Sequence, residues 1–517
     1  MKFLIQIFIV VVFLAGCGND PDQTQTVNER PNIIYILADD LGYGELGCYG
    51  QELIETPNLD ALAAGGMRFT QHYTGAPVCA PARCILMTGK HSGHAFVRGN
   101  DEWGERGDVW NYQAMFQDST LEGQRPLPAE EITVAEILQQ HHYRTGMVGK
   151  WGLGAPDTEG IPNEQGFDFF YGYICQRQAH TYYPMHLWHN SRREFLDNPM
   201  VAPRTGLEEG ADPDDSASYT KFHLKYYAPQ LMHEEALDFV ERNQNSPFFL
   251  YYASPIPHVP LQAPGRWVDH YREKFGPESP YTGDNGYFPC QYPHATYAAM
   301  ISYLDEQVGD LVDKLKSLGI YDQTLIIFSS DNGPTYVGGA DTQFFDSAKP
   351  FKTAYGWGKG FVNEGGIRVP MIASWPGKIA PNTQSTLISC FVDVMPTICD
   401  ILEIDPPANT DGISFLPTLL GKETQVKHEY LYWEFPEYNG QQAVRLNNYK
   451  GIRKNIQKGN LEIELYDLAS DPQESNNVAA KNPDIIDRVK EIMKQEHTEA
   501  TTKRFRMAAL GDKTENQ

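Results

Sequence analysis

Residues 77–89 read P-V-C-A-P-A-R-C-I-L-M-T-G, and the rest of the chain is organised around this stretch. The residues before it, 67–73, alternate in the manner of a β-strand. Pro81 and Gly89 stand where a short helix tends to begin and to end. We therefore predict that Cys79 lies where a strand leads into a helix N-terminus, which offers free N–H groups and a positive potential. Arg83, about one turn further on, would face the same bound anion.

The chain around this stretch alternates apolar strands with amphipathic helices. Strands are predicted at 33–37, 67–73, 143–148, 248–253 and 325–328, and helices at 133–141, 231–240 and 297–318. This order indicates an α/β fold with a mainly parallel sheet flanked by helices. Ligands of such sheets bind beyond the carboxyl ends of the strands. The polar residues that follow these strands should therefore meet in one active site; they are Asp39, Asp40, Cys79, Arg83, Lys150, His258, Asp331 and Asn332.

The two ends of the chain differ from this central body. Residues 1–17 read as a secretory signal that ends in L-A-G-C, which resembles a bacterial lipobox with Cys17 as the acylated residue; a plain cleaved signal peptide is the alternative. Residues 18–30 are a polar tether, and 31–405 form the α/β catalytic domain. Residues 406–500 predict a smaller α+β subdomain with an antiparallel sheet and a covering helix at 483–496. Residues 501–517 are expected to be a disordered tail.

Composition limits the classes of partner. With 41% hydrophobic and 21% charged residues, the chain can bury a large core. Its net charge of −25 argues against nucleic acid, because a phosphate backbone would be repelled. An anionic substrate must therefore be captured by a local cationic pocket. The spacing of the eight cysteines matches no metal or disulfide framework, so their pairing stays open.

The whole string 77–89 resembles the signature of the sulfatase family, the formylglycine-dependent, arylsulfatase-like branch of the alkaline phosphatase superfamily. The resemblance implies the alkaline-phosphatase-like fold and conversion of Cys79 to formylglycine (3-oxoalanine) by a maturation enzyme. In this family the hydrated aldehyde attacks sulfur with one hydroxyl and the substrate alcohol leaves. The second hydroxyl then expels sulfate and regenerates the aldehyde.

A divalent cation is the expected cofactor. Asp39 and Asp40 lie in L-A-D-D-L-G-Y-G, and Asp331 and Asn332 lie in S-S-D-N-G. These residues offer oxygen ligands, which suit calcium or magnesium better than zinc. The resemblance implies one Ca²⁺ per chain held by these four residues, with the residue at position 79 also at the metal; Mg²⁺ is the alternative.

Four further residues take catalytic roles by the same resemblance. Lys150 in V-G-K-W-G-L-G and Lys359 in K-G-F-V-N-E-G-G-I-R-V-P match two sulfate-binding lysines, and Arg83 belongs to the modification string. His258, in P-I-P-H-V-P, matches a histidine with a general-acid role. One position departs from the family, which has K-W-H where this chain has Gly152.

The long insertion between Lys150 and the helix at 231–240 is the candidate for substrate recognition. It is rich in aromatic residues, arginine and histidine, groups that stack on sugars or bind hydroxyls and sulfates. We expect Arg177 and His180 to contact a sulfated carbohydrate, and one histidine of the insertion to fill the space beside Gly152. The alternative is that these aromatics only pack the insertion onto the body.

These observations predict a sulfuric ester hydrolase acting on a sulfated carbohydrate or aryl sulfate, exported and lipid-anchored at a bacterial membrane, in the periplasm or at the outer membrane or cell surface. Two alternatives remain. One is a phosphomonoester, phosphodiester or phosphonate monoester hydrolase on the same fold. The other is a catalytically impaired, lipid-anchored glycan-binding protein, which only Gly152 favours.

Overall fold

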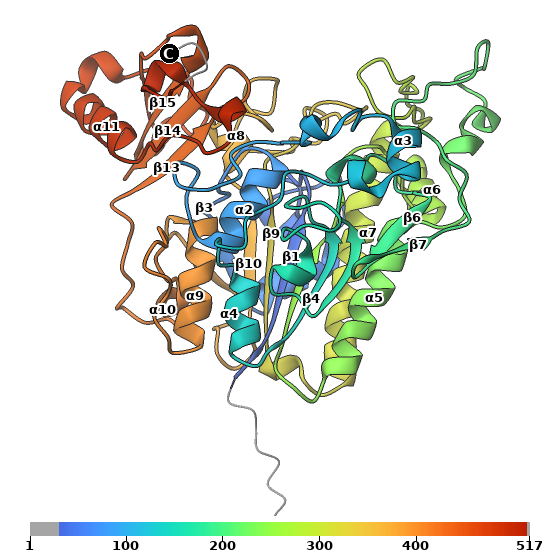
Figure 1. Ribbon diagram of the computed structural model, residues 1–517, viewed down its shortest axis with the longest axis horizontal. Coiled ribbons are helices and arrows are strands. Elements are labelled where there is room, and N and C mark those ends of the chain that lie inside the picture. Colours follow the sequence, from blue (N-terminus) through green and yellow to red (C-terminus); the bar gives the residue numbers. More distant parts are fainter. Residues whose placement is uncertain (1–29, 514–517) are drawn as a thin grey trace, which may run out of the picture.

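A ten-stranded sheet forms the centre of the computed structural model, which describes residues 30–513 (Figure 1). Its strand order is β11-β2-β10-β9-β1-β8-β4-β5-β6-β7. The middle of the sheet is parallel and consists of β9 (Thr324–Ser330), β1 (Asn32–Ala38), β8 (Phe248–Ala253), β4 (Arg144–Lys150) and β5 (Phe169–Tyr173). The outer strands are β11 (Thr383–Ser385), β2 (Met67–Phe69), β10 (Met371–Ser374), β6 (His186–His189) and β7 (Arg192–Phe195). The mainly parallel sheet predicted from the sequence is confirmed.

Helices cover both faces of this sheet, and β1 shows why. Its residues Ile33, Tyr35 and Leu37 join one core cluster, while Ile34, Ile36 and Ala38 join the other. Both faces of the strand are therefore buried, which explains its unbroken apolar run. The first cluster includes α2 (Cys79–Thr88), α4 (Val134–Gln140) and α9 (Val394–Ile401). The second includes α1 (Pro57–Ala64), α5 (Ala228–Asn243), α6 (Gly265–Phe275) and α7 (Pro293–Ser317), and Figure 1 shows α4 and α9 opposite α5 and α7.

The segment that leads to Cys79 differs from its prediction as one strand. The chain bends at Thr70 and Gln71, so that β2 pairs with β10 in the large sheet and β3 (His72–Tyr73) pairs with β12 (Ser389–Cys390). The helix prediction is confirmed: α2 begins at Cys79, and Gly89 ends it in the left-handed conformation. Short helices α3 (Tyr112–Gln117), α8 (Glu364–Ile367) and α10 (Leu416–Leu419) complete the body.

The smaller C-terminal part is a four-stranded antiparallel sheet with one helix, as predicted. Its strands are β13 (Tyr430–Phe435), β14 (Gln441–Leu446), β15 (Tyr449–Lys454) and β16 (Glu464–Asp467), and α11 (Pro483–Gln495) covers one face. The other face joins the main core through Trp433, whose indole N–H donates to the carbonyl of Thr74 at 2.8 Å. The buried ion pair of Lys450 with Glu364 of α8, at 2.9 Å, also joins the two parts, and Glu474 of the smaller part lies 3.0 Å from the same lysine.

The expected disorder after residue 500 is wrong for the tail through Lys513. This segment forms two 3-10 turns, Lys503–Phe505 and Ala508–Leu510, and buries Phe505 and Met507. These two apolar side chains anchor the segment to the body. The segment is otherwise mostly polar, and this composition led to the prediction of disorder.

Residues 1–29 and 514–517 lie outside the described part, so the signal, most of the tether and Cys17 are not described. Within residues 30–513, no helix combines the length and apolar character that crossing a bilayer requires. The seven cysteines of this range are free of disulfide bonds.

Candidate active site

Cys79 is the centre of a buried polar cluster at the carboxyl edge of the large sheet. Its side chain is only 2% exposed, and its Sγ lies 3.3 Å from Asp39 Oδ1. The Nζ atoms of Lys150 and Lys359 lie 3.5 and 3.6 Å from the same sulfur. Burial and the nearby Asp39 raise the pKa of the Cys79 thiol well above its usual value. The unmodified residue is therefore a protonated thiol and a poor nucleophile.

Strand pairing brings the predicted oxygen ligands together. β1 and β9 are parallel neighbours, so the residues that follow them, Asp39 and Asp40 after one and Asp331 and Asn332 after the other, share one edge. The Asp40 N–H donates to Asp331 Oδ1 at 3.1 Å, and Asn332 Nδ2 donates to Asp40 Oδ1 at 2.7 Å. All four side chains are fully buried.

Cationic side chains balance these carboxylates. Lys150, the last residue of β4, lies 2.5 Å from Asp39, and Lys359 lies 2.6 Å from Asp40. Arg83 lies 2.9 Å from Asp331 and also contacts Asp39 at 3.4 Å. Although burial acts against it, Lys150 with other nearby cations lowers the pKa of Asp39. Burial and the charge of Asp39 instead raise the pKa of Asp331 to about 6, so the three carboxylates compete for positive charge.

The donor set fits a hard divalent cation. Asn332 Oδ1 is buried and has no hydrogen-bond partner in the described structure, an unfavourable state that a metal ligand would relieve. Donor atoms of Asp39, Asp40, Cys79 and His258 all lie within 4.8 Å of one another. Carboxylate and amide oxygens predominate, as calcium and magnesium prefer.

His258 completes the cluster from the loop after β8. Its Nδ1 lies 2.5 Å from the Val259 carbonyl, so Nδ1 carries a proton and Nε2 faces Asp40 at 3.9 Å. The hydroxyl of Tyr182 reaches the carbonyls of both Pro255 and His258 at 2.5 Å and fixes this loop. Burial, with Lys359 and Lys150, holds the pKa of His258 well below its usual value.

A cavity of about 590 Å³ opens onto these residues. Cys79, Lys150, His258 and Lys359 line its inner end, so four of the five predicted catalytic side chains share one cavity. The expectation that Arg83 faces the same bound anion is wrong, because its guanidinium is fully buried and held by Asp331 and Asp39. Its outer wall comes from segments that sequence reasoning missed: Asn100, Glu102, Asp108, Trp110, Gln176, Tyr287, Tyr336, Glu437, Tyr438 and Arg504. Loops far apart in the chain supply them, and the sequence carried no signal for that convergence.

The insertion contributes less to this cavity than predicted. His180 lines it, and its ring stacks on that of His258 with centroids 5.6 Å apart and planes at 12°. Arg177 does not line it: its side chain is 1% exposed, pairs with Glu102 and donates to the Leu121 carbonyl at 2.9 Å. The expected contact of Arg177 with substrate is therefore wrong in this geometry, because buried partners already hold its guanidinium. It acts as a positioning residue for Glu102.

Gly152 is covered by Gln176 and not by a histidine. A Cβ at position 152 would lie 2.7 Å from Gln176 Cγ, and the backbone there has φ +84°. The expectation that a histidine of the insertion fills this space is wrong, because His180 is committed to its stack on His258. Gln176 reaches Asn100 instead, with its Nε2 3.4 Å from Asn100 Oδ1.

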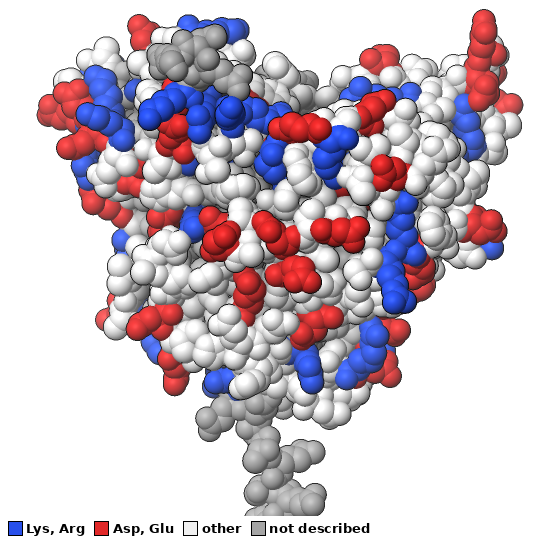
Figure 2. Space-filling view, in the orientation of Figure 1, with Lys and Arg blue, Asp and Glu red and all other residues white. Residues whose placement is uncertain are grey.

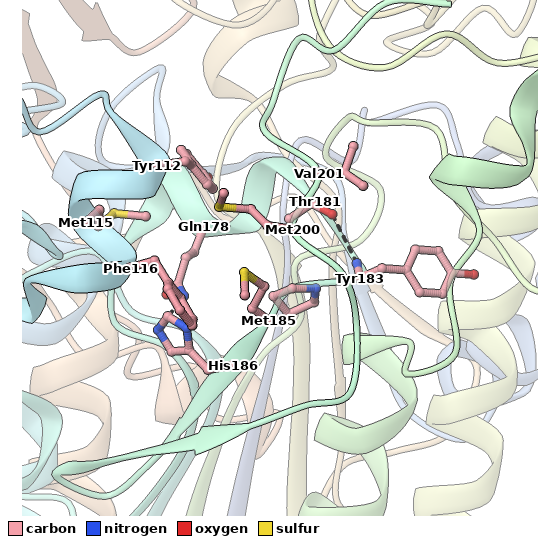
Figure 3. A pocket seen from close by; sticks show the side chains of 11 residues that line it. Tyr112, Met115, Phe116, Gln178, Thr181, Tyr183, Met185, His186, Met200 and Val201 are labelled. Atoms are coloured by element: carbon pink, nitrogen blue, oxygen red, sulfur yellow. Dashed lines mark hydrogen bonds between the residues drawn. The ribbon is translucent and has the colours of Figure 1, made fainter.

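Most other aromatics of the insertion pack internally. Figure 3 shows a second pocket where α3 meets the insertion, with Tyr112, Met115, Phe116, Met185 and His186 around it. Its volume is about 30 Å³, which is room for about one water and not for a sugar. His186 and Trp188 meet the buried Glu122 at 2.9 and 2.8 Å. The packing alternative therefore holds for this part of the insertion.

Comparison with known proteins gives matches along nearly the whole chain. Residues 31–404 match the family model described as Sulfatase, and residues 354–503 match the model of the N-sulphoglucosamine sulphohydrolase C-terminal region. Arylsulfatase A of Homo sapiens is 33% identical over 503 residues, covering 90% of this chain and 87% of that protein. N-acetylgalactosamine-6-O-sulfatase of Bacteroides thetaiotaomicron is 27% identical, covering 94% and 97%.

Solved structures with a similar fold also match along most of the chain. Ps i-CgsB, also solved in complex with k-i-k-neocarrahexaose, has a TM-score of 0.70 and 27% identity over 90% of this chain and 93% of that one. A phosphonate monoester hydrolase of Agrobacterium radiobacter has a TM-score of 0.63 at 21% identity over 90% and 96%, which shows a shared fold alone.

The packing of Gln176 on Gly152 is testable. Gly152→Ala should destabilise the protein by roughly 1–3 kcal/mol, because a side chain at positive φ is strained and its Cβ meets Gln176. Adding Gln176→Ala to this variant should recover only the stability lost to the clash with Gln176, because the strain of a side chain at positive φ remains. Gly265→Ala, where a Cβ meets nothing within 4 Å, is the control. Thermal unfolding measures all three; a Gly152→Ala protein as stable as the control would contradict this account.

Proposed function

The chain belongs to the sulfatase family, and from that premise we propose that it hydrolyses sulfate esters of carbohydrates with a formylglycine made from Cys79 and with one bound Ca²⁺. The enzyme class is a sulfuric ester hydrolase acting on sulfated glycans or aryl sulfates. The observation that carries the finer proposal is the position of Cys79. It stands at a helix N-terminus between Asp39 and two lysines, at the inner end of a cavity.

Formylglycine is supported by the chemistry of this position. The encoded thiol is buried, and its raised pKa makes it a poor nucleophile. It nevertheless lies in the complete C-x-P-x-R string and beside cations suited to an anionic substrate. The hydrated aldehyde would supply an oxygen nucleophile for sulfur and a second hydroxyl for release of sulfate. A formylglycine-generating maturation enzyme is therefore a proposed partner.

The chain's own residues divide the remaining tasks. Lys150 and Lys359 flank position 79 and would bind sulfate oxygens, since an ammonium group is a compact donor to an anion. Arg83 holds Asp331 and Asp39 in place from behind. His258 directs Nε2 into the cavity, where a bound sulfate anion would offset the lysine charges and favour protonation of this nitrogen. It could then pass that proton to the leaving oxygen of the sugar.

Asp39, Asp40, Asp331 and Asn332, together with the residue at position 79, would hold the cation. A bound Ca²⁺ would supply positive charge at a sulfate oxygen and at the nucleophile. We favour calcium over magnesium because the site offers three carboxylates and an amide oxygen, whereas Mg²⁺ usually keeps several waters and takes one or two carboxylates.

The carbohydrate substrate is proposed on two supports. One relative is an N-acetylgalactosamine-6-O-sulfatase, and a different one, Ps i-CgsB, was solved in complex with k-i-k-neocarrahexaose. The cavity wall also presents Trp110, Tyr287, Tyr336 and Tyr438, aromatic rings of the kind that pack against sugar faces.

Cys79→Ala should reduce sulfate release by on the order of a thousandfold or more, because the covalent step has no substitute. Cys84→Ala is the matched control, since Cys84 is equally buried on the same helix but belongs to the apolar core. Mass spectrometry of the peptide with residue 79 should show the aldehyde or its hydrate. A fully active preparation with only the thiol would disprove the mechanism.

Removing the metal should abolish turnover, and Ca²⁺ should restore it better than Mg²⁺. Asn332→Ala should weaken calcium binding measured by calorimetry, because one ligand oxygen is lost. Asn163→Ala is the control, since Asn163 also has an unpartnered Oδ1 but does not line the cavity. Full activity after exhaustive chelation, or unchanged calcium affinity in Asn332→Ala, would reject this site.

We also propose that the protein is exported and anchored at a bacterial membrane through lipid on Cys17, in the periplasm or at the outer membrane or cell surface. The support is the apolar run and L-A-G-C ending of residues 1–17. Cys17→Ala should move the protein from the membrane fraction to the soluble fraction, while Cys48→Ala should not. Membrane retention of Cys17→Ala would show that the lipobox interpretation is wrong.

A further inference from the structure

The catalytic cavity has two ends of opposite character. At the inner end, Lys150 and Lys359 stand beside Cys79 and are suited to one sulfate group. The more exposed lining residues, which form the outer end, include three carboxylates, Glu102, Asp108 and Glu437. Aromatic rings and the amides of Asn100 and Gln176 also line the cavity. The part of the substrate beyond the sulfate therefore meets hydrogen-bond acceptors and ring faces.

Arg504 is the one basic residue among the described side chains that line the outer end, and it is already paired. Its guanidinium lies 3.2 Å from Asp101 and 3.5 Å from Glu437. Its side chain is 48% exposed, so solvent weakens any attraction that it could offer to a second anion. Glu102 is paired with Arg177, so the excess of negative charge among these residues rests on Asp108 and on Glu437.

The basic surface nearby does not change this balance. Figure 2 shows basic side chains gathered around the C-terminal end, with acidic ones among them. In that part of the chain, Arg506 lies 3.0 Å from Glu499. From a separate loop before α4, Arg125 lies 2.5 Å from Asp101 and 2.6 Å from Glu105. These guanidinium groups are held by carboxylates of the protein itself. The net charge of −25 adds a long-range repulsion of polyanions.

Glu437 is the carboxylate best placed to select the substrate. Its Oε2 accepts the backbone N–H of Asn100 at 3.1 Å, which fixes the side chain at the cavity wall. Its side chain keeps 24% exposure, and its contact with Arg504 is long. Burial raises the pKa of Glu437, in agreement with a carboxylate short of compensating charge. Sugar hydroxyls can donate to such an oxygen, whereas a sulfate or a uronate carboxylate cannot.

We propose that the leaving group is a neutral sugar whose only anionic group near the cavity is the sulfate being removed. This inference rests on the proposed function and adds the substrate class. Hydroxyl groups would donate to Glu437 and its neighbours while a sugar face lies on the aromatic wall. A second sulfate or a carboxylate on the same or the adjoining sugar would face Glu437 and Asp108 and be repelled.

The test compares kcat/KM on three substrates: para-nitrophenyl sulfate, a monosulfated galactose and the same galactose with a second sulfate. The monosulfated sugar should exceed the disulfated one by about tenfold or more, because like charges in a partly desolvated site repel. Glu437→Gln keeps an acceptor oxygen for the Asn100 N–H and removes the charge, so it should reduce that preference several-fold. Glu499→Gln, which neutralises a carboxylate outside the cavity wall, should leave the preference unchanged.

Asp108→Asn supplies a second variant at an exposed position, where folding is not at stake, and it should also reduce the preference. Turnover of the aryl sulfate together with equal or faster hydrolysis of the disulfated sugar would overturn the substrate class while leaving the proposed function intact. Loss of turnover on all three substrates by metal-loaded protein carrying the modified residue would overturn both. An unchanged preference in both Glu437→Gln and Asp108→Asn would also overturn the inference.

Discussion

The structure depends on one electrostatic constraint: three buried carboxylates must each be paired with a cationic side chain. Asp39, Asp40 and Asp331 are fully buried, and their charges are met by Lys150, Lys359 and Arg83 at 2.5 to 2.9 Å. Burying one such charge alone would be prohibitive, so each side chain requires its partner. The strands that carry them must therefore end at a common edge. The parallel order of β9, β1, β8 and β4 provides that edge.

The same arrangement explains how the site would handle an anion. The lysines are attracted to Asp39 and Asp40 but also flank position 79, so a sulfate can share their charge. Charge on the far side of the cavity is of the opposite sign, through Glu437 and Asp108. The cavity thus separates recognition of the sulfate from recognition of the sugar. The family relation explains the first part.

The sequence predicted the central fold and the inner site because both follow from local patterns. Strand β1 is apolar on both faces, a pattern that predicts a buried parallel strand. Asp39 and Asp40 follow it directly and mark its end. The outer wall was not predictable in this way. Arg177 is bound by Glu102, 75 positions earlier, and Arg504 meets Asp101 across 403 positions. Nothing in either local sequence indicates such a partner, so Arg177 was assigned to the substrate and the tail was expected to be disordered.

The central claim is that this site transfers sulfate by attack on sulfur. Hydrolysis of a monosulfated sugar in water labelled with heavy oxygen tests it most directly, with mass spectrometry of both products. Attack on sulfur breaks the bond between sulfur and the sugar oxygen, so the label should enter the released sulfate and the sugar should keep its original oxygen. Label in the sugar hydroxyl would show cleavage of the carbon–oxygen bond and contradict the account.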